Sequence, residues 1–325
     1  MKSMITAGIE STAHTFGIGI CDGKGILANV VDSYHGEGIH PRLAADHHAH
    51  VAGSVLSKAL DEAGIGADDI DLVSFSQGPG LGPCLRIGAT TARALSVTRS
   101  IPIIGVNHCI AHIEVGRFLM GIRDPVTLYV SGGNTQILAF AGGRYRIFGE
   151  TLDIGIGNMQ DTFARALGLD FPCGKQVDAL MGAGVNYLDI PYTIKGMDFS
   201  FTGMLTEAEK LLSAHTPEDV TFSLMETAFS IVVEATERAM AHTRKDELLL
   251  AGGNAASPRL REMCNLMCED RGAEVFIPPF GVCRDNGAMI AVLGMIEYQA
   301  GRRMELRDTT VLQKWRTDEV DVTWR

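Results

Sequence analysis

Three short turns at the ends of apolar, strand-like stretches constrain the fold of this chain most. They span residues 10–15, 131–135 and 252–257, and the last two contain adjacent glycines. Turns of this kind point backbone N–H groups at an anion, and glycine lets the backbone approach the anion closely. One such turn is equally compatible with an ordinary hairpin. Three in the same context predict a nucleotide that lies between two lobes.

The strand pattern around the first two turns repeats along the chain. In both places a strand, a small polar turn carrying a threonine, a second strand, a glycine turn and a third strand follow one another, at residues 5–9, 15–21 and 26–33 and again at 126–130, 136–141 and 145–150. We infer an internal duplication, with two similar lobes that each open with a β-hairpin. The first lobe is expected over residues 1–125, joined by a C-terminal helix and tail over 286–325, and the second over 126–285.

The remaining pattern alternates strands with helices, which predicts an α/β fold. Further strands are expected at 71–77, 101–106, 248–251 and 274–277, and helices at 43–63, 85–98, 108–120, 158–167, 177–183, 203–214, 217–244, 258–271 and 286–300. Ligands in such folds bind at the carboxyl ends of strands, where the three turns fall. The stretch 195–203 is expected to be a loop, either over a site or as a plain surface connection.

Composition excludes several classes of protein. The 28 basic and 39 acidic residues give a net charge of −11, which argues against a chain that binds nucleic acid alone over a broad basic face. A hydrophobic content of 46% excludes disorder as the main state. The sequence contains no apolar run of about 18 residues and no signal-peptide core, so we expect a cytoplasmic protein without a membrane partner. The seven scattered cysteines, with no CxxC pair, are expected to be reduced thiols, several of them buried.

His108 and His112 form the sharpest chemical signal. They are four residues apart at the start of an expected helix, so they share one face and can hold one metal ion. Asp285, just before the last helix, is a candidate third ligand, and Tyr129, at a strand end, a candidate fourth. This nitrogen and oxygen set suits iron or zinc. Cys109 stands where a metalloprotease with an HExxH motif has its glutamate, so that mechanism lacks its general base.

Other polar residues carry two readings each. Asp161 and Asp178 are suited either to accept hydrogen bonds from ribose hydroxyls or to cap the starts of helices. His47, His48 and His50 lie on the expected helix 43–63, where a solvated or interface role is favoured over metal binding.

The sequence resembles a known family over nearly its whole length. The motifs that carry the resemblance are residues 8–15, Gly-Ile-His-Pro-Arg at 38–42, Gly-Pro-Gly-Leu-Gly at 78–82, residues 105–114, Tyr-Val-Ser-Gly-Gly-Asn-Thr at 129–135, residues 151–161 and Asp-Asn-Gly at 285–287. They resemble the universal tRNA threonylcarbamoyladenosine synthase family in its archaeal and eukaryotic form, the catalytic subunit of the KEOPS complex.

The resemblance implies the two-lobed superfold of actin, sugar kinases and the large heat-shock chaperones. It also implies an acyltransferase that moves a threonylcarbamoyl group from threonylcarbamoyl-AMP to the exocyclic amine of the tRNA adenosine 3′ of the anticodon. It implies a divalent metal, Fe²⁺ or Zn²⁺, on His108, His112, Tyr129 and Asp285. The adenylate-binding positions that it implies are Tyr129, Val130, Ser131, Gly132, Gly133, Asp161, Gly174 and Asp178.

Two departures from the family pattern fall in the adenylate site. The family turn Gly-Gly-Val-x-x-Asn reads Gly-Gly-Asn-Ala-Ala-Ser here, so Ser257 takes the nucleotide-contacting position and an asparagine, Asn254, appears three residues earlier. Cys173 stands where the family usually has glycine. No Ser/His/Asp triad is visible, and Glu10 and His14 are both candidates for the group that deprotonates the attacking amine.

Two alternative functions compete with the transferase. The superfold also serves ATPases and phosphotransferases, but a kinase needs only hydrated Mg²⁺ held by carboxylates, not a histidine pair. A non-catalytic interaction subunit would be expected to lack the metal set. Because the chain is acidic, we expect it to act on tRNA with partner subunits, and the resemblance points to a small atypical protein kinase and a dimerising subunit.

Overall fold

The computed structural model describes residues 3–36, 40–169 and 173–325, and the chain divides into two compact units. Unit 1 comprises Met1–Gly121, Gly142–Arg144 and Pro279–Arg325, and unit 2 comprises Ile122–Ala141 and Tyr145–Pro278. Gly38 and Ile39 of the 38–42 motif lie outside the described residues. Within the described ranges, no helix is long and apolar enough to cross a membrane. All seven cysteines are free and buried, as predicted.

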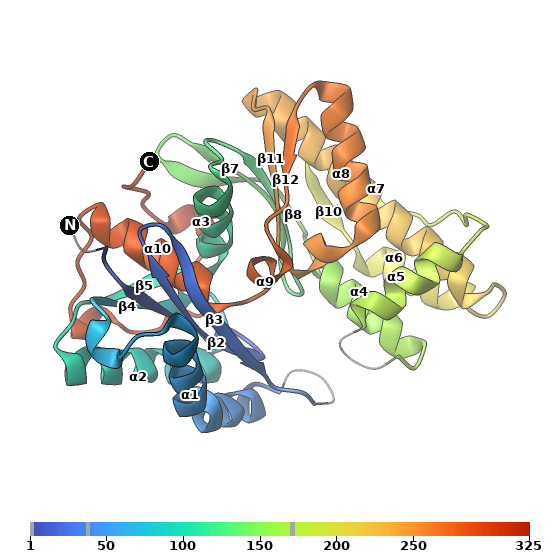
Figure 1. Ribbon diagram of the computed structural model, residues 1–325. Coiled ribbons are helices and arrows are strands. Elements are labelled where there is room, and N and C mark those ends of the chain that lie inside the picture. Colours follow the sequence, from blue (N-terminus) through green and yellow to red (C-terminus); the bar gives the residue numbers. More distant parts are fainter. Residues whose placement is uncertain (1–2, 37–39, 170–172) are drawn as a thin grey trace. The chain divides into compact units, whose positions relative to one another are not determined.

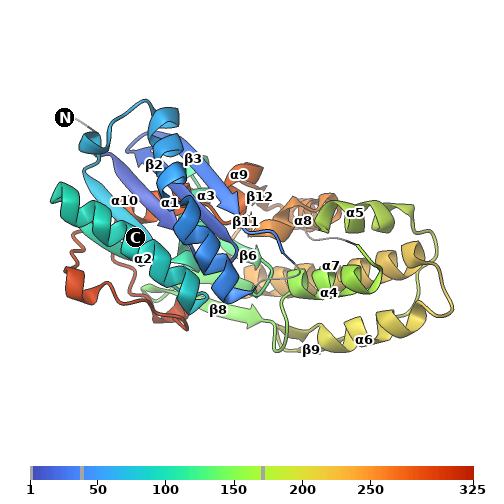
Figure 2. The same cartoon turned by 90° about the horizontal axis from the view of Figure 1, so that it is seen from below.

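Unit 1 is built on a five-stranded sheet between two layers of helices. The strand order is β3 (Gly25–Ser33), β2 (Thr15–Asp22), β1 (Thr6–Glu10), β4 (Leu72–Gly78) and β5 (Ile103–Asn107), antiparallel over the first three strands and parallel from β1 to β5. Helices α1 (Pro41–Ala63) and α2 (Gly82–Arg99) pack side by side on one face (Figure 2). Helices α10 (Gly287–Gln299) and α3 (His108–Met120) lie on the other (Figure 1).

Residue alternation in the central strands decides which helix packs on which face. Ala7 and Ile9 of β1 belong to the same buried cluster as Val55 of α1 and Ala89 of α2. Side chains alternate between the two faces of a strand, so Gly8 faces the opposite layer.

Gly8 of β1 and Gly19 of β2 are paired neighbours in the sheet, and α10 packs directly on them. A Cβ atom on Gly8 would lie 2.1 Å from the backbone nitrogen of Ala291, and one on Gly19 would lie 2.1 Å from that of Ala288. The helix backbone therefore rests directly on the strand backbones. This contact fixes the start of α10, and with it Asp285, two residues before the helix.

Unit 2 repeats the same sheet. Its strand order is β8 (Arg144–Glu150), β7 (Thr135–Ala141), β6 (Val126–Val130), β11 (Glu247–Ala251) and β12 (Glu274–Phe276), with β6, β11 and β12 parallel. The order matches that of unit 1 strand for strand, so the duplication predicted from the repeated hairpins is confirmed. Its helices are α4 (Ile156–Ala166), α5 (Gly174–Ala183), α6 (Thr202–Leu211), α7 (Pro217–Thr243) and α8 (Pro258–Arg271).

The stretch predicted as a loop over 195–203 is a hairpin, so that prediction is wrong. Strands β9 (Thr193–Lys195) and β10 (Asp198–Ser200) pair across a turn in which Gly196 has a φ of +68°. Phe199 and Phe201 alternate into the core of unit 2, which holds the segment against the sheet. This alternation is typical of a strand, but Gly196 in the turn favoured the prediction of a loop. The short helix α9 (Phe280–Cys283) was also not predicted.

Short 3-10 turns and extended chain complete the two units. The 3-10 turns are Ala67–Asp69, Gly253–Ala256, Leu306–Asp308 and Thr317–Glu319. The C-terminal segment packs on unit 1, where the Gln77 side chain donates to the carbonyl oxygens of Asp308 and Thr310. Near its end, the indole N–H of Trp324 donates to Glu114 of α3 at 2.9 Å.

We predict that Gly19→Ala destabilises unit 1 by about 3 kcal/mol, because the new methyl group would overlap the backbone of α10 and force it away from the sheet. The matched control is Gly25→Ala, where nothing lies within 4 Å of the added Cβ and a change within about 0.5 kcal/mol is expected. Urea unfolding of both variants measures the difference. Equal losses would contradict the close helix–sheet contact.

Candidate metal centre and nucleotide-binding turns

Helix α3 begins directly after β5 and presents both histidines on one face. The side chain of Asn107 caps the helix by accepting from the backbone N–H groups of Cys109 and Ile110, at 3.0 and 3.2 Å. His108 is the first helical residue and His112 lies one turn later, with ring centroids 4.8 Å apart. Capping at residue 107 thus fixes the direction in which the pair points.

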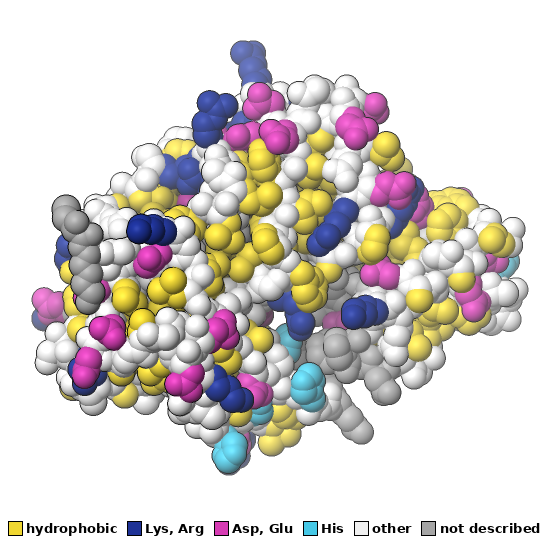
Figure 3. Space-filling view, in the orientation of Figure 1, with side chains coloured by type: hydrophobic (Ala, Val, Ile, Leu, Met, Phe, Trp, Pro, Cys, Tyr) yellow, Lys and Arg dark blue, Asp and Glu magenta, His cyan; other side chains and the backbone are white. Residues whose placement is uncertain are grey.

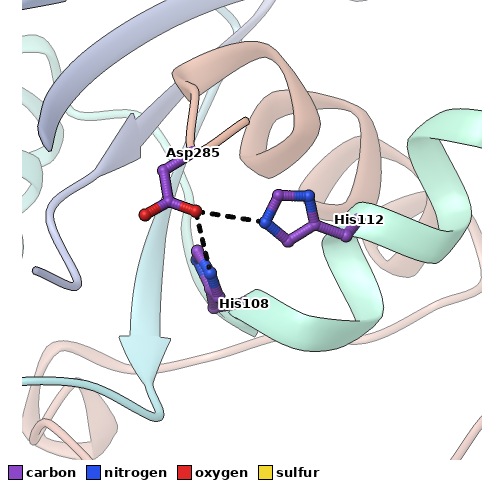
Figure 4. A group of neighbouring side chains, drawn as sticks. All are labelled: His108, His112 and Asp285. Carbon is purple, nitrogen blue, oxygen red and sulfur yellow. Dashed lines mark hydrogen bonds and ion pairs between the residues drawn. The ribbon is translucent and has the colours of Figure 1, made fainter. Parts of the chain in front are cut away.

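Asp285 meets both histidines in one cluster (Figure 4). Its Oδ1 atom lies 3.4 Å from Nε2 of His108 and 3.3 Å from Nε2 of His112. The three ligand atoms lie within 4.8 Å of one another, and this is the one such group found among the described residues. Two imidazole nitrogens and a carboxylate oxygen that converge from two helix starts fit a single transition-metal ion.

The electrostatics of the cluster follow from burial and mutual attraction. Burial opposes a charge on His108, but the carboxylates of Glu10 and Asp285 outweigh it and raise the pKa of His108 well above its usual value. Burial lowers the pKa of His112. Burial also opposes the charge on Asp285, yet the two histidines hold the pKa of its carboxyl well below the usual range. In the absence of a metal, the cluster therefore favours an ionised Asp285 beside a protonated His108, and a bound metal ion would take the place of that proton.

Glu10 lies behind His108, and the sequence did not reveal this contact. The carboxylate is fully buried at the end of β1, and its Oε2 atom lies 2.9 Å from Nδ1 of His108. His14, the other candidate base, lies in the turn after β1, where its carbonyl accepts from the N–H of Tyr34. Motif spacing alone did not reveal Asn107 as the cap of α3, nor the contacts of Glu10 with His108 and with the backbone N–H of Thr12.

Tyr129 and Cys109 have different surroundings. Tyr129 is buried in β6 of unit 2, so its role as the fourth ligand remains a prediction. Burial raises the pKa of the Cys109 thiol, which makes it unfit as a general base.

The histidines of α1 form no metal-binding group with other residues that the structure describes. His47 pairs with Asp32 at 3.0 Å, and Nε2 of His48 contacts the carbonyl of Ala13 at 3.0 Å. Burial lowers the pKa of His48 to about 4, so this side chain is neutral at pH 7. His50 is exposed.

In unit 2, two of the sequence-predicted turns follow neighbouring parallel strands. Tyr129 pairs with Ala251 in the register of β6 and β11, so the turns after both strands begin at the same sheet edge. The first turn contacts the start of α4, where the N–H of Asn158 donates to the carbonyl of Gly132 at 2.9 Å. Val130 is buried, Ser131 is partly exposed, and Gly132 and Gly133 are exposed, so the tip of the turn is accessible.

The two departures contact the two predicted ribose carboxylates. The thiol of Cys173 lies 2.9 Å from Oδ1 of Asp161 on α4, and the hydroxyl of Ser257 donates to Oδ1 of Asp178 on α5 at 2.8 Å. Burial raises the pKa of Asp178, and the Ser257 hydroxyl acts in the opposite direction. Neither contact follows from sequence spacing.

Gly174 and Asn254 complete the predicted set. Gly174 is the first residue of α5 and has open space around its Cβ position. If Gly157 carried a Cβ atom, that atom would lie 2.9 Å from the amide nitrogen of Asn254 and 2.7 Å from Cα of Gly132. This amide therefore lies over the start of α4, beside the first glycine of the turn.

Solved structures confirm the expected superfold. The phosphate- and nucleotide-bound HypF structure aligns over 92% of this chain and 47% of that chain, with a TM-score of 0.63 and 11% identity. The ROK hexokinase from Thermus thermophilus aligns over 91% of this chain and all of that chain, with a TM-score of 0.51 and 15% identity. Fold and duplication define the actin-like ATPase and sugar-kinase class.

Within that class, sequence comparison identifies the family. Residues 25–292 match the family model TsaD, tRNA N6-adenosine threonylcarbamoyltransferase. The protein of that name from Thermococcus kodakarensis is 57% identical over 99% of this chain and its own full length. A probable bifunctional tRNA threonylcarbamoyladenosine biosynthesis protein from Methanobrevibacter smithii is 53% identical over the whole of this chain, which covers 61% of that protein. The chain belongs to the TsaD family and is a transferase.

We predict that the wild-type chain binds one transition-metal ion. His112→Ala should bind it on the order of 100-fold more weakly, because only His108 and Asp285 of the cluster remain as ligands. His50→Ala, which removes an exposed histidine of the same unit, should bind as the wild type does. Elemental analysis after dialysis and titration with Zn²⁺ provide the measurement. Equal metal content in all three proteins would contradict the site.

Proposed function

We propose that this chain transfers a threonylcarbamoyl group from threonylcarbamoyl-AMP to the exocyclic amine of the tRNA adenosine 3′ of the anticodon. Family membership carries the reaction class. The single observation that favours this transfer over a plain ATPase or phosphotransferase of the same fold is the His108, His112 and Asp285 cluster. Hydrated Mg²⁺ in phosphoryl transfer needs carboxylates and phosphates, not a buried histidine pair.

The two units supply different parts of the reaction. A metal bound at the cluster supplies Lewis-acid stabilisation of charge on the acyl oxygen; Fe²⁺ and Zn²⁺ both suit the donor set. The turn of unit 2 after β6, whose tip at Gly132 and Gly133 is exposed, suits the phosphate of the adenylate. Asp161 and Asp178 are suited to hold its ribose hydroxyls. AMP is a good leaving group, so the reaction needs no covalent enzyme intermediate.

Charge indicates that the transferase works with partners. The net charge of −11 slows encounter with a polyanion. On the face seen in Figure 3, Lys and Arg side chains are mixed with Asp and Glu and form no continuous basic area. We propose that KEOPS-type subunits, a small atypical protein kinase and a dimerising subunit, supply further basic surface for tRNA.

We predict that Asp161→Ala weakens binding of AMP to the chain by about 1–3 kcal/mol, because the ribose hydroxyl loses its hydrogen bond to the carboxylate. The control is Asp270→Ala, the same charge change near the far end of α8, at an exposed position. Calorimetry measures both affinities, and Ser257→Asn in the same series tests the family residue at that turn. Unchanged affinity in Asp161→Ala would remove this carboxylate from the site.

We predict that threonylcarbamoyl transfer to tRNA by the isolated chain is slow and rises at least about tenfold when the partner subunits are added, because they offset its charge. The assay follows the modified nucleoside at fixed salt. A parallel reaction without tRNA measures release of phosphate from the nucleotide. Gel-shift titrations report tRNA binding with and without partners. Tight binding and full turnover by the chain alone would contradict the dependence.

A further inference from the structure

Glu10 has both of its carboxylate oxygens committed to neighbours. Oε1 accepts from the backbone N–H of Thr12 at 2.6 Å and from the Thr12 hydroxyl, and Oε2 contacts Nδ1 of His108 at 2.9 Å. The side chain is 0% exposed. Because it is fully buried and both oxygens contact neighbours, this carboxylate is not open to a substrate amine.

The contact determines which nitrogen of His108 carries its proton. An ionised carboxylate only accepts hydrogen bonds, so Nδ1 must be the donor toward Glu10. In the neutral imidazole the lone pair then lies on Nε2, the atom 3.4 Å from Oδ1 of Asp285. Nε2 is the nitrogen that the cluster needs as a donor to a metal.

We propose that Glu10 is a positioning residue that acts through His108. It holds the imidazole in the Nδ1–H form and fixes the ring so that Nε2 points to the metal ligand position, while Thr12 fixes Glu10 in turn. Ligating histidines in proteins commonly donate their second N–H to a carboxylate in this way, and loss of such a partner weakens metal binding about 10- to 100-fold. This role replaces general-base chemistry at Glu10, and it rests on the proposed metal site.

The local sequence explains why Glu10 can hold this position. It is the last residue of β1, and the chain turns at once so that Thr12, two residues on, reaches back to the same carboxylate. The β1 strand lies in the middle of the unit 1 sheet, beside β4. The positioning carboxylate is therefore anchored at the end of the central strand of the sheet, whereas the ligands lie on α3 and just before α10.

The test compares Zn²⁺ binding of the full chain with that of Glu10→Gln. Glutamine keeps the size and offers an oxygen to Thr12, but its NH₂ group then faces Nδ1 and favours the tautomer with the proton on Nε2. We expect 10- to 100-fold weaker Zn²⁺ binding in chelator competition, and an altered absorption spectrum with Co²⁺. The control is Glu297→Gln, a fully buried carboxylate of α10 paired with Arg302, which should leave Zn²⁺ affinity unchanged.

A second measurement needs no variant and therefore does not depend on its folding. Nitrogen-15 NMR of the histidines in the Zn²⁺-loaded wild type should show His108 protonated at Nδ1 and ligated through Nε2. Ligation through Nδ1, or equal Zn²⁺ affinity in wild type and Glu10→Gln, would overturn the positioning role and leave the proposed transferase intact. A wild-type chain that binds neither Zn²⁺ nor Co²⁺ would overturn both the positioning role and the metal assistance proposed for the transfer.

Discussion

The contact between the backbone of α10 and the glycine pair of β1 and β2 is the constraint on which the cluster of His108, His112 and Asp285 depends. Because Gly8 and Gly19 have no side chains, the helix start lies directly on the sheet, and Asp285 arrives where α3 presents its two histidines. Any side chain at Gly8 or Gly19 would push α10 outward and separate Asp285 from both rings. A packing requirement in the core thus becomes a geometric requirement at the site.

The sheet of unit 1 also positions the residues around this cluster. The strand β1 carries Gly8, which seats α10, and ends at Glu10, which contacts His108. The strand β5 ends at Asn107, which caps α3. Ligands from two helices are thus aligned by the ends of two strands in one sheet, and each ligand-bearing helix start has its own anchor. Such separate anchoring holds the three ligand atoms close together.

Much of this arrangement was predictable from sequence because it rests on local patterns. The strand–turn–strand repeat predicted the duplicated sheets, and the spacing of His108 and His112 predicted a shared helix face. The contacts of Glu10 with His108, Cys173 with Asp161 and Ser257 with Asp178 were not predictable, since each joins residues from separate elements. The hairpin of β9 and β10 was missed because Gly196 concealed the alternation of Phe199 and Phe201.

The departures at positions 173 and 257 both replace the family's residue with a small polar side chain that contacts a carboxylate. In unit 2 each of the two carboxylates contacts a small polar group from a neighbouring segment, a thiol for Asp161 and a hydroxyl for Asp178. A partly buried carboxylate without such a partner loses some of the hydrogen bonds that water would supply. Ser257 is too short to replace an asparagine amide toward a ligand, whereas Asn254 places an amide beside Gly132. In this chain the amide therefore lies on the α4 side of the turn, while the serine at the family's asparagine position donates to Asp178.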